Sequence, residues 1–196
     1  MLAGILAFQG DVAEHAAVLR TLHVPFQEVR TLADLAPVTH LIIPGGESTV
    51  MGRFLILSGI GKEMTKRVKQ GALSIFGTCA GAILLARKVK GKNAPASYAL
   101  IDMTVERNSY GTQAQSFSAN IAVKGIAKPI SMAFIRAPKI LWTGRGVEVM
   151  ASHKGNPVIV RQGNIWASTC HPEVNGNVEL HALWLRQAGM PAPHLK

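Results

Sequence analysis

The sequence has little cysteine and few charged residues, and each shortage excludes a class of protein. Only two of the 196 residues are cysteines, Cys79 and Cys170, which excludes a disulfide scaffold and gives no paired spacing of metal ligands. We therefore expect no metal and no cofactor, and a reducing, cytoplasmic compartment. Charged residues make up 16% of the chain and apolar residues 48%, a composition that excludes intrinsic disorder.

The sequence also lacks a segment suited to crossing a membrane. The uncharged run over residues 70–86 contains three glycines, and it falls short of the roughly 20 apolar residues that a span requires. The apolar N-terminus, residues 1–8, contains no basic residues and is soon followed by Asp11. This pattern is typical of a buried first strand and not of a signal peptide, so we expect no association with a membrane.

Acidic residues are scarce, and the basic ones are clustered. Eleven Asp and Glu stand against 21 Lys and Arg, for a net charge of +10. Eight basic residues lie between positions 62 and 92: Lys62, Lys66, Arg67, Lys69, Arg87, Lys88, Lys90 and Lys92. No aromatic residues alternate with the basic ones, as they often do in nucleic-acid surfaces, so binding to nucleic acid is not favoured. We interpret the cluster as a solvated face at two helix ends, with docking of an acidic partner as the alternative.

Short apolar runs alternate with helical patterns in the first half of the chain. The predicted strands cover residues 2–8, 26–29, 40–43 and 73–76. The predicted helices cover residues 12–22, 48–57, 62–69 and 79–89, the last ended by Gly91. Because the strands are continuously apolar, both faces of the sheet should be covered. This indicates an α/β fold with a mostly parallel central sheet and helices on both faces.

The second half of the chain is richer in strand patterns. We expect strands at residues 103–106, 115–123, 132–135, 147–152, 158–161 and 165–169, and a last helix at residues 176–188. Gln162-Gly163-Asn164 is typical of a hairpin turn. These strands should form an antiparallel β extension that completes the sheet. No linker or repeat divides the chain, so residues 1–196 are predicted to form a single domain.

The sharpest local signal surrounds the first cysteine. An apolar strand runs into Gly-Thr-Cys-Ala-Gly at residues 77–81 and then directly into a helix. This is the nucleophile-elbow pattern with cysteine in place of serine. The glycines permit a sharp turn, and the helix N-terminus stabilises a thiolate and offers N–H groups to an oxyanion. Cys79 is therefore the candidate nucleophile.

A base for this thiol follows the last predicted strand, in His171-Pro172-Glu173. Residues two apart in extended backbone point to the same side, so Glu173 can orient His171 toward Cys79. We interpret the remaining histidines as surface or packing residues: His15, His23, His40, His153, His181 and His194. Cys170 should point to the opposite face from His171, and we expect it to be structural.

Two further segments place polar groups beside strand ends. Pro-Gly-Gly-Glu-Ser-Thr at residues 44–49 follows a buried strand, and Ser48 is the expected helix N-cap. This loop is suited either to cradling a phosphate, although it lacks the lysine of a Walker loop, or to giving an oxyanion N–H opposite Cys79, or it is a simple turn. Arg107 and Arg136 each lie beside a strand, where an arginine can bind a substrate carboxylate.

Together these motifs resemble the class I glutamine amidotransferases, which have a flavodoxin-like fold. Glu-Arg-Asn-Ser-Tyr-Gly at residues 106–111 and Phe-Ile-Arg-Ala-Pro at residues 134–138 narrow the resemblance to the glutaminase subunit of pyridoxal 5′-phosphate synthase. The resemblance covers the chain from the first strand to the last helix. Tyr110, where the family more commonly has Phe, is a mild departure.

The resemblance implies a triad of Cys79, His171 and Glu173 that hydrolyses L-glutamine through a glutamyl thioester. It also implies an oxyanion hole at the backbone of Gly46 and Ala80. The residues implied to contact L-glutamine are Gly46, Glu47, Ser48, Arg107, Ile135 and Arg136.

The resemblance further implies a partner, a (β/α)₈-barrel synthase (lyase) subunit that receives the ammonia within a hetero-oligomeric complex. Gln9 matches a family position that responds to docking of this partner. Three alternatives stay open: a glutaminase for another amidotransferase pathway, a cysteine hydrolase of the related elbow fold, and a basic, non-catalytic binding module.

Overall fold

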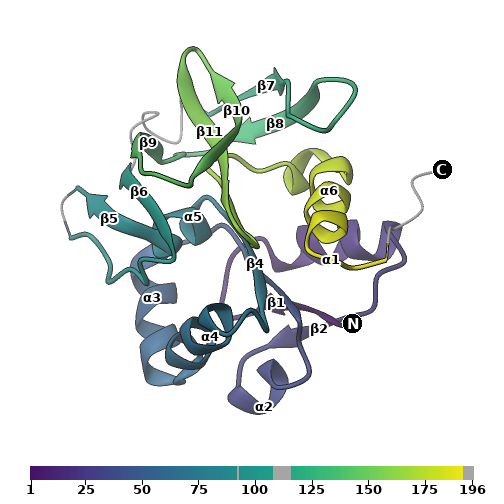
Figure 1. Ribbon diagram of the computed structural model, residues 1–196, viewed down its shortest axis with the longest axis vertical. Helices are drawn as coiled ribbons and strands as arrows, with labels where there is room; N and C mark the ends of the chain where they lie inside the picture. The colour runs from purple at the N-terminus through teal and green to yellow at the C-terminus, as the bar shows by residue number, and fades with distance from the viewer. Residues whose placement is uncertain (92, 108–115, 192–196) are drawn as a thin grey trace.

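A computed structural model of the chain describes residues 1–91, 93–107 and 116–191. At its centre lies a seven-stranded sheet (Figure 1). In spatial order its strands are β10 (Glu148–His153), β11 (Asn156–Gln162), β12 (Ile165–Ser168), β4 (Ser74–Thr78), β3 (His40–Ile43), β1 (Ala3–Leu6) and β2 (Phe26–Val29). Five of these strands are parallel from β12 to β2, and β10 and β11 are antiparallel at one edge.

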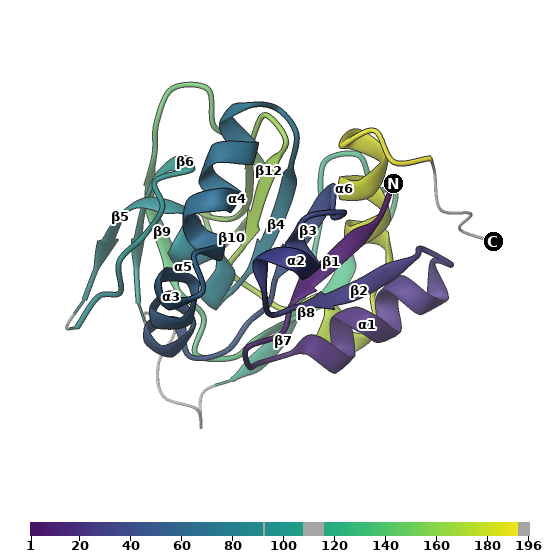
Figure 2. The same cartoon turned by 90° about the horizontal axis from the view of Figure 1, so that it is seen from below.

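Helices cover both faces of this sheet, as Figure 2 shows. One face carries α1 (Val12–Thr21) and α6 (Glu179–Gln187). The other carries α3 (Ser48–Leu57), α4 (Ile60–Lys69) and α5 (Ala80–Leu85), with the short α2 (Leu32–Leu35) beside α4. Within β3, Ile42 packs into the first core while Leu41 and Ile43 pack into the second. The predicted α/β fold with a mostly parallel, two-sided sheet is therefore confirmed.

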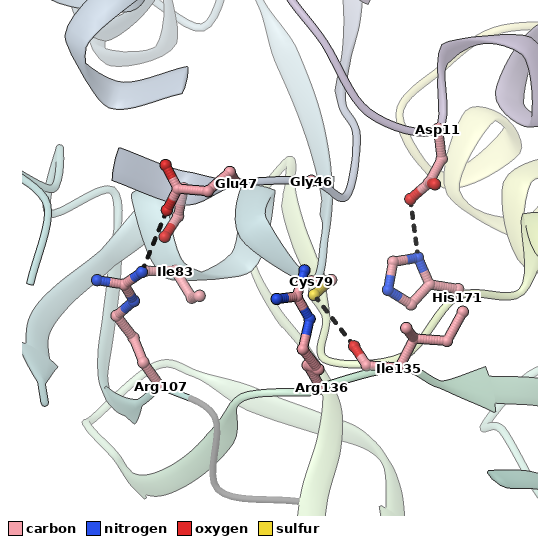
Figure 3. A pocket seen from close by; sticks show the side chains of 10 residues that line it. Asp11, Gly46, Glu47, Cys79, Ile83, Arg107, Ile135, Arg136 and His171 are labelled. Carbon is pink, nitrogen blue, oxygen red and sulfur yellow. Dashed lines mark hydrogen bonds and ion pairs between the residues drawn. The ribbon is translucent and has the colours of Figure 1, made fainter. Parts of the chain in front are cut away.

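Two small sheets flank the central one. β5 (Ala86–Lys90), β6 (Ile101–Glu106) and β9 (Lys139–Thr143) form the first, which extends the α3–α5 core. β7 (Phe117–Ile121) and β8 (Ile130–Phe134) form the second, which extends the α1–α6 core. The first sheet brings Arg107, and the second brings Ile135 and Arg136, to the carboxyl ends of the parallel strands (Figure 3).

Several predicted elements differ from the structure. The helix expected at residues 79–89 ends at Leu85, because Ala86 turns to extended backbone (φ −65°, ψ 148°) and the next residues pair with β6 as β5. Gly91 therefore ends a strand and not a helix. The extension was also expected to complete the central sheet as antiparallel strands; β10, β11 and β12 do join it, but β12 lies parallel to β4, and β6, β7 and β8 belong to the two small sheets. The short elements α2 and β9 were missed.

The basic cluster is divided between two kinds of structure. Lys62, Lys66, Arg67 and Lys69 lie on α4, as predicted. Arg67 does more than face solvent, because its guanidinium donates to the carbonyl groups of Leu35, at 2.7 Å, and Val38. Arg87, Lys88 and Lys90 lie on β5, so the second predicted helix end was wrong. Lys92 lies outside the described residues.

Among the described residues, no helix is both long and apolar enough to cross a membrane.

Candidate active site

The first cysteine stands in a strained turn between β4 and α5. Cys79 has φ 46° and ψ −96°, a conformation that costs a non-glycine residue roughly 1–3 kcal/mol. Both flanking glycines are needed there. A β-carbon on Gly77 would lie 2.7 Å from the Gly81 carbonyl carbon, and one on Gly81 would overlap the carbonyl oxygen of Ile43. The sequence pattern thus follows from close backbone packing, and the predicted nucleophile elbow is present.

A cavity of about 190 Å³ opens in front of this turn (Figure 3). The cysteine is largely buried, and its Sγ lies 4.0 Å from the carbonyl oxygen of Ile135. The residues that line the cavity are Asp11, Gly46, Glu47, Ser48, Cys79, Ile83, Arg107, Ile135, Arg136 and His171. The cavity therefore contains the predicted nucleophile and base, and all the residues expected to contact L-glutamine.

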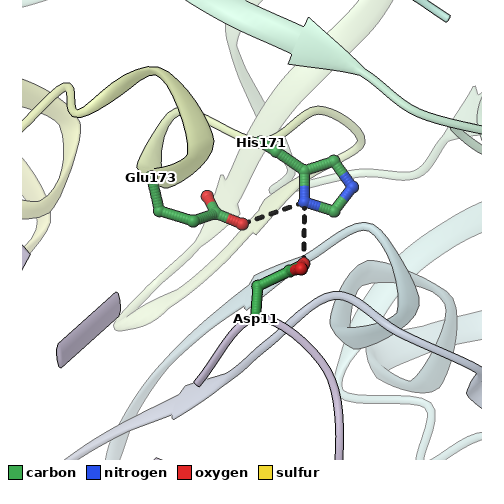
Figure 4. A group of neighbouring side chains, drawn as sticks. All are labelled: Asp11, His171 and Glu173. Atoms are coloured by element: carbon green, nitrogen blue, oxygen red, sulfur yellow. Dashed lines mark hydrogen bonds and ion pairs between the residues drawn. The ribbon is translucent and has the colours of Figure 1, made fainter. Parts of the chain in front are cut away.

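The predicted base is held by two carboxylates (Figure 4). Nδ1 of His171 lies 2.9 Å from Oε1 of Glu173 and 3.1 Å from Oδ2 of Asp11. Since Nδ1 is occupied on that side, Nε2 is the nitrogen left for the sulfur of Cys79. The sequence predicted the contact with Glu173. It missed Asp11, although Asp11 follows a strand of the parallel sheet and so lies at its functional edge.

Electrostatics favour a charged His171. Burial opposes its protonation, but hydrogen bonds with Asp11, Cys79 and Glu173 raise the pKa of the imidazole well above its ordinary value. Burial raises the pKa of Glu173, and the hydrogen bond from His171 counteracts this. The ligand atoms of Asp11, His171 and Glu173 all lie within 4.8 Å of one another, as metal ligands would. Pairing of one imidazole with two carboxylates accounts for that spacing.

The loop after β3 forms the opposite wall of the cavity. The N-cap of α3 is Glu47 and not Ser48 as predicted, because the Glu47 carboxylate accepts hydrogen bonds from the N–H groups of Thr49 (3.0 Å) and Val50 (2.7 Å). Burial acts against ionisation of Glu47, but these bonds lower the pKa of its carboxyl group. Arg107 pairs with Glu47 at 3.3 Å, which puts opposite charges side by side at one end of the cavity.

The side chain of Gln9 holds this loop through hydrogen bonds to its backbone. Its Nε2 donates to the carbonyl oxygen of Glu47 (2.9 Å), and its Oε1 accepts from the N–H of Glu47 (3.2 Å). Gly46 has φ +145°, and a β-carbon there would lie 2.7 Å from Gln9 Oε1. Gln9 thus contacts the candidate oxyanion loop directly. Ala80 begins α5, where the first N–H groups lack partners within the helix.

The second small sheet supplies the remaining wall. Arg136 has φ 44°, a left-handed conformation uncommon for a side chain of this size, and it lines the cavity with Ile135.

Arg107, which follows β6 in the first small sheet, also donates to the carbonyl oxygen of Asn93 at 2.7 Å. The other predicted motif residues beside Arg107, at positions 108–111 and including Tyr110, lie outside the described residues.

The second cysteine takes no part in the cavity. Cys170 is fully buried, and its thiol lies 3.2 Å from Sδ of Met132 and 3.3 Å from Oγ of Ser168. Burial raises the pKa of the Cys170 thiol to about 12, so it remains a thiol at neutral pH. This supports the structural role expected for it.

Two histidines interpreted as surface or packing residues, His15 and His181, are buried in contact with each other, and His15 lies beside Glu173. Nε2 of His15, on α1, lies 3.2 Å from Thr78 Oγ1 and 3.5 Å from Glu173 Oε1. Nδ1 of the same ring lies 2.9 Å from Nε2 of His181, on α6. These two histidines are 166 positions apart, so the sequence alone gave no sign that they meet.

Comparisons with known proteins identify the family of the chain. The model of the SNO glutamine amidotransferase family matches residues 5–189. The pyridoxal 5′-phosphate synthase subunit PdxT of Pseudothermotoga lettingae is 44% identical over 190 residues, which cover 97% of each chain. The protein of the same name from Thermus thermophilus is 42% identical, with 96% of this chain and 98% of that one covered.

Comparison with solved structures leads to the same family. The crystal structure of a glutamine amidotransferase is 42% identical and superimposes with a TM-score of 0.91, over 96% of this chain and 99% of that one. PurLQS from Thermotoga maritima is 16% identical with a TM-score of 0.62, over 95% and 96% of the two chains, and shares the fold alone. The chain belongs to the SNO glutamine amidotransferase family.

Proposed function

We propose that this protein is the glutaminase subunit of pyridoxal 5′-phosphate synthase, which hydrolyses L-glutamine to L-glutamate and ammonia. One observation carries the proposal. A strained cysteine at the end of β4 shares a cavity with a histidine whose Nδ1 is held by Glu173. The full-length similarity to proteins named as subunits of this synthase supports the pathway. In this proposal residues 1–196 act as one glutaminase domain.

The chemistry follows from the placement of Cys79 and His171. Because the carboxylates favour its imidazolium form, His171 has taken the thiol proton before the reaction begins, and the Cys79 thiolate attacks the side-chain amide carbon of glutamine to form a C–S bond. The resulting oxyanion is stabilised by the N–H groups of Gly46 and Ala80. His171 then gives its proton to the departing nitrogen, which leaves as ammonia. His171, now neutral, takes a proton from water, which hydrolyses the glutamyl thioester, releases glutamate and returns Cys79 and His171 to their starting state.

Glu173 and the walls of the cavity have separate tasks. Glu173 holds the His171 ring in the tautomer and orientation that this proton transfer needs. The charged pair of Glu47 and Arg107 is suited to the α-ammonium and α-carboxylate of an amino acid. Three further residues would contact the rest of the substrate: Ser48, Ile135 and Arg136.

The ammonia would pass to a (β/α)₈-barrel synthase (lyase) subunit in a hetero-oligomeric, cytoplasmic complex. Gln9 would transmit the docking of the synthase subunit to the oxyanion loop, since its side chain forms hydrogen bonds with both the N–H and the carbonyl oxygen of Glu47. The net charge of +10 would complement an acidic synthase surface. If so, the complex should weaken steeply as salt rises, and binding that ignores salt would contradict this part of the proposal.

The test is glutamate formation from L-glutamine by the purified chain, alone and with a pyridoxal 5′-phosphate synthase subunit. We expect activity to rise strongly with the partner, to vanish in Cys79→Ala and to persist in Cys170→Ala, the matched control. No activity with the partner present would reject this pathway. Activity that survives Cys79→Ala would reject the mechanism.

A further inference from the structure

A chain of buried polar groups that do not line the cavity leads away from the triad. Oε1 of Glu173 accepts from Thr78 Oγ1 at 3.3 Å, in addition to His171. Thr78 Oγ1 contacts His15 Nε2, and His15 Nδ1 contacts His181 Nε2. All of these side chains are buried. The chain joins α6, α1 and β4 to Glu173, and Figure 2 shows the two helices on the same face of the sheet.

The chemistry of Glu173 fixes the direction of every hydrogen bond in this chain. An ionised carboxylate only accepts, so the single hydroxyl hydrogen of Thr78 goes to Glu173. The oxygen of Thr78 must then accept from an N–H at Nε2 of His15. Because His15 Nε2 is also 3.5 Å from Glu173 Oε1, a lone pair at this nitrogen would face the carboxylate charge.

The same logic determines the second ring. A neutral His15 with hydrogen on Nε2 has a bare Nδ1, which accepts from Nε2–H of His181. Nδ1 of His181 is then an unprotonated acceptor, and it is buried with no hydrogen-bond partner among the described residues. The opposite direction would bury an unpaired N–H. Burial lowers the pKa of His181 to about 3, and burial followed by repulsion from His181 and His171 lowers the pKa of His15.

The carboxylate depends on this chain, because it is anchored through one oxygen. Oε2 of Glu173 is buried and has no hydrogen-bond partner among the described residues. Its charge is stabilised at Oε1 by His171, Thr78 and His15, with help from its own backbone N–H, and is opposed by burial and by the nearby Asp11 carboxylate. Loss of donors from a buried carboxylate makes it a stronger base and allows it to rotate.

We propose that His15 and His181, acting through Thr78, are positioning residues of the glutaminase. This neutral histidine pair gives a one-directional hydrogen-bond chain that keeps the Glu173 carboxylate ionised and aimed at Nδ1 of His171. Neither histidine lines the cavity, so neither touches the substrate. The inference deepens the proposed function and rests on it.

The kinetic test uses the complex with the synthase subunit and four matched substitutions. Thr78→Val and His15→Leu should each lower kcat about tenfold, as loss of a hydrogen bond to a charged group predicts, and His181→Leu should lower it less. KM for glutamine should stay within about twofold of the wild-type value, because the cavity is untouched. The acid limb of the pH–rate profile should move to higher pH by about one pH unit, since Glu173 becomes easier to protonate. Thr78→Ser, which keeps the hydroxyl group, should have the wild-type kcat and the wild-type acid limb.

His40→Leu is the control for burial alone. His40 is 2% exposed and bonds Thr39 Oγ1 and the carbonyl oxygen of Ala188, away from the triad. The His40→Leu protein should lose stability as the other variants do, but its kcat and pH–rate profile should match those of the wild type. If His15→Leu and His40→Leu have the same kcat and acid limb, the positioning role is wrong.

A measurement without substrate separates this inference from the function. Nitrogen-15 NMR of the wild-type chain should show His15 and His181 neutral at pH 6, both with hydrogen on Nε2. A hydrogen on Nδ1 of either ring, or a doubly protonated ring, would overturn the chain direction and with it the proposal. Absence of glutaminase activity in the wild-type complex would instead reject the proposed function, while the NMR result would still decide the hydrogen-bond chain.

Discussion

Substitution of Gly81 by alanine tests whether close packing of α5 on β3 holds Cys79 in place. Gly81 lies within α5, where alanine is intrinsically better than glycine by about 1 kcal/mol. Its β-carbon, however, would overlap the carbonyl oxygen of Ile43, a backbone atom in the centre of the sheet that has no freedom to move aside. Overpacking of this kind costs roughly 1–3 kcal/mol beyond any gain in propensity.

Gly52 provides the matched control. It too lies within a helix, α3, but the nearest atom to an added β-carbon is the end of the Leu84 side chain, at 3.2 Å. Gly52→Ala should therefore change stability by less than about 1 kcal/mol, in the stabilising direction. Gly81→Ala should lose about 1–3 kcal/mol, a fall in Tm of roughly 2–12 °C for a chain of this size.

The assay is urea denaturation together with the rate at which an electrophilic glutamine analogue alkylates Cys79. We expect Gly81→Ala to slow alkylation as well as to lose stability, because displacement of α5 moves the turn that presents the sulfur. A Gly81→Ala protein with the stability and alkylation rate of Gly52→Ala would refute the packing argument.

Three further predictions concern the titrating groups. Iodoacetamide at neutral pH should modify Cys79 in the native protein and reach Cys170 only after unfolding, since the Cys170 pKa is raised to about 12; mass spectrometry checks this, and early labelling of Cys170 would contradict it. Asp11→Asn should lower the pKa of His171, which the Asp11 hydrogen bond raises, and move the alkaline limb of the pH–rate profile to lower pH; an unchanged limb would show that Glu173 alone sets it. The pKa of His181 is about 3 when folded against 6.5 when unfolded, so the unfolded state binds its proton first. The contribution of neutral His181 to the free energy of unfolding is therefore fully present above pH 6.5 and falls below it, by about 2 kcal/mol between pH 8 and pH 5. His181→Leu should remove this part of the pH dependence, as measured by urea denaturation at each pH.

Local sequence patterns predicted the parts of the site that depend on local backbone. Gly77 and Gly81 mark the turn because no other residue fits there, and the strand before them is buried along its whole length because both its faces are covered. His171 and Glu173 follow another strand of the same parallel sheet. Carboxyl ends of parallel strands share one edge, so Cys79 and His171 were expected to meet.

The failures came where distant contacts decide the outcome. Residues 86–90 are rich in lysine and arginine, which suit a helix, but pairing with β6 makes them a strand. Ser48 is the better N-cap by preference, yet Glu47 takes that position because its side chain reaches two N–H groups of α3. His15 and His181 become neighbours only when α1 and α6 pack on the same face of the sheet.

The central claim is that Cys79 forms a glutamyl thioester, and trapping that thioester tests it most directly. The complex with the synthase subunit would be mixed with L-glutamine, quenched with acid during turnover, and digested for peptide mass spectrometry. We expect an adduct with the mass of glutamine less ammonia on the peptide that contains Cys79, and none in Cys79→Ala. Steady glutamate release with no adduct on that peptide, or with an adduct on another residue, would contradict the account.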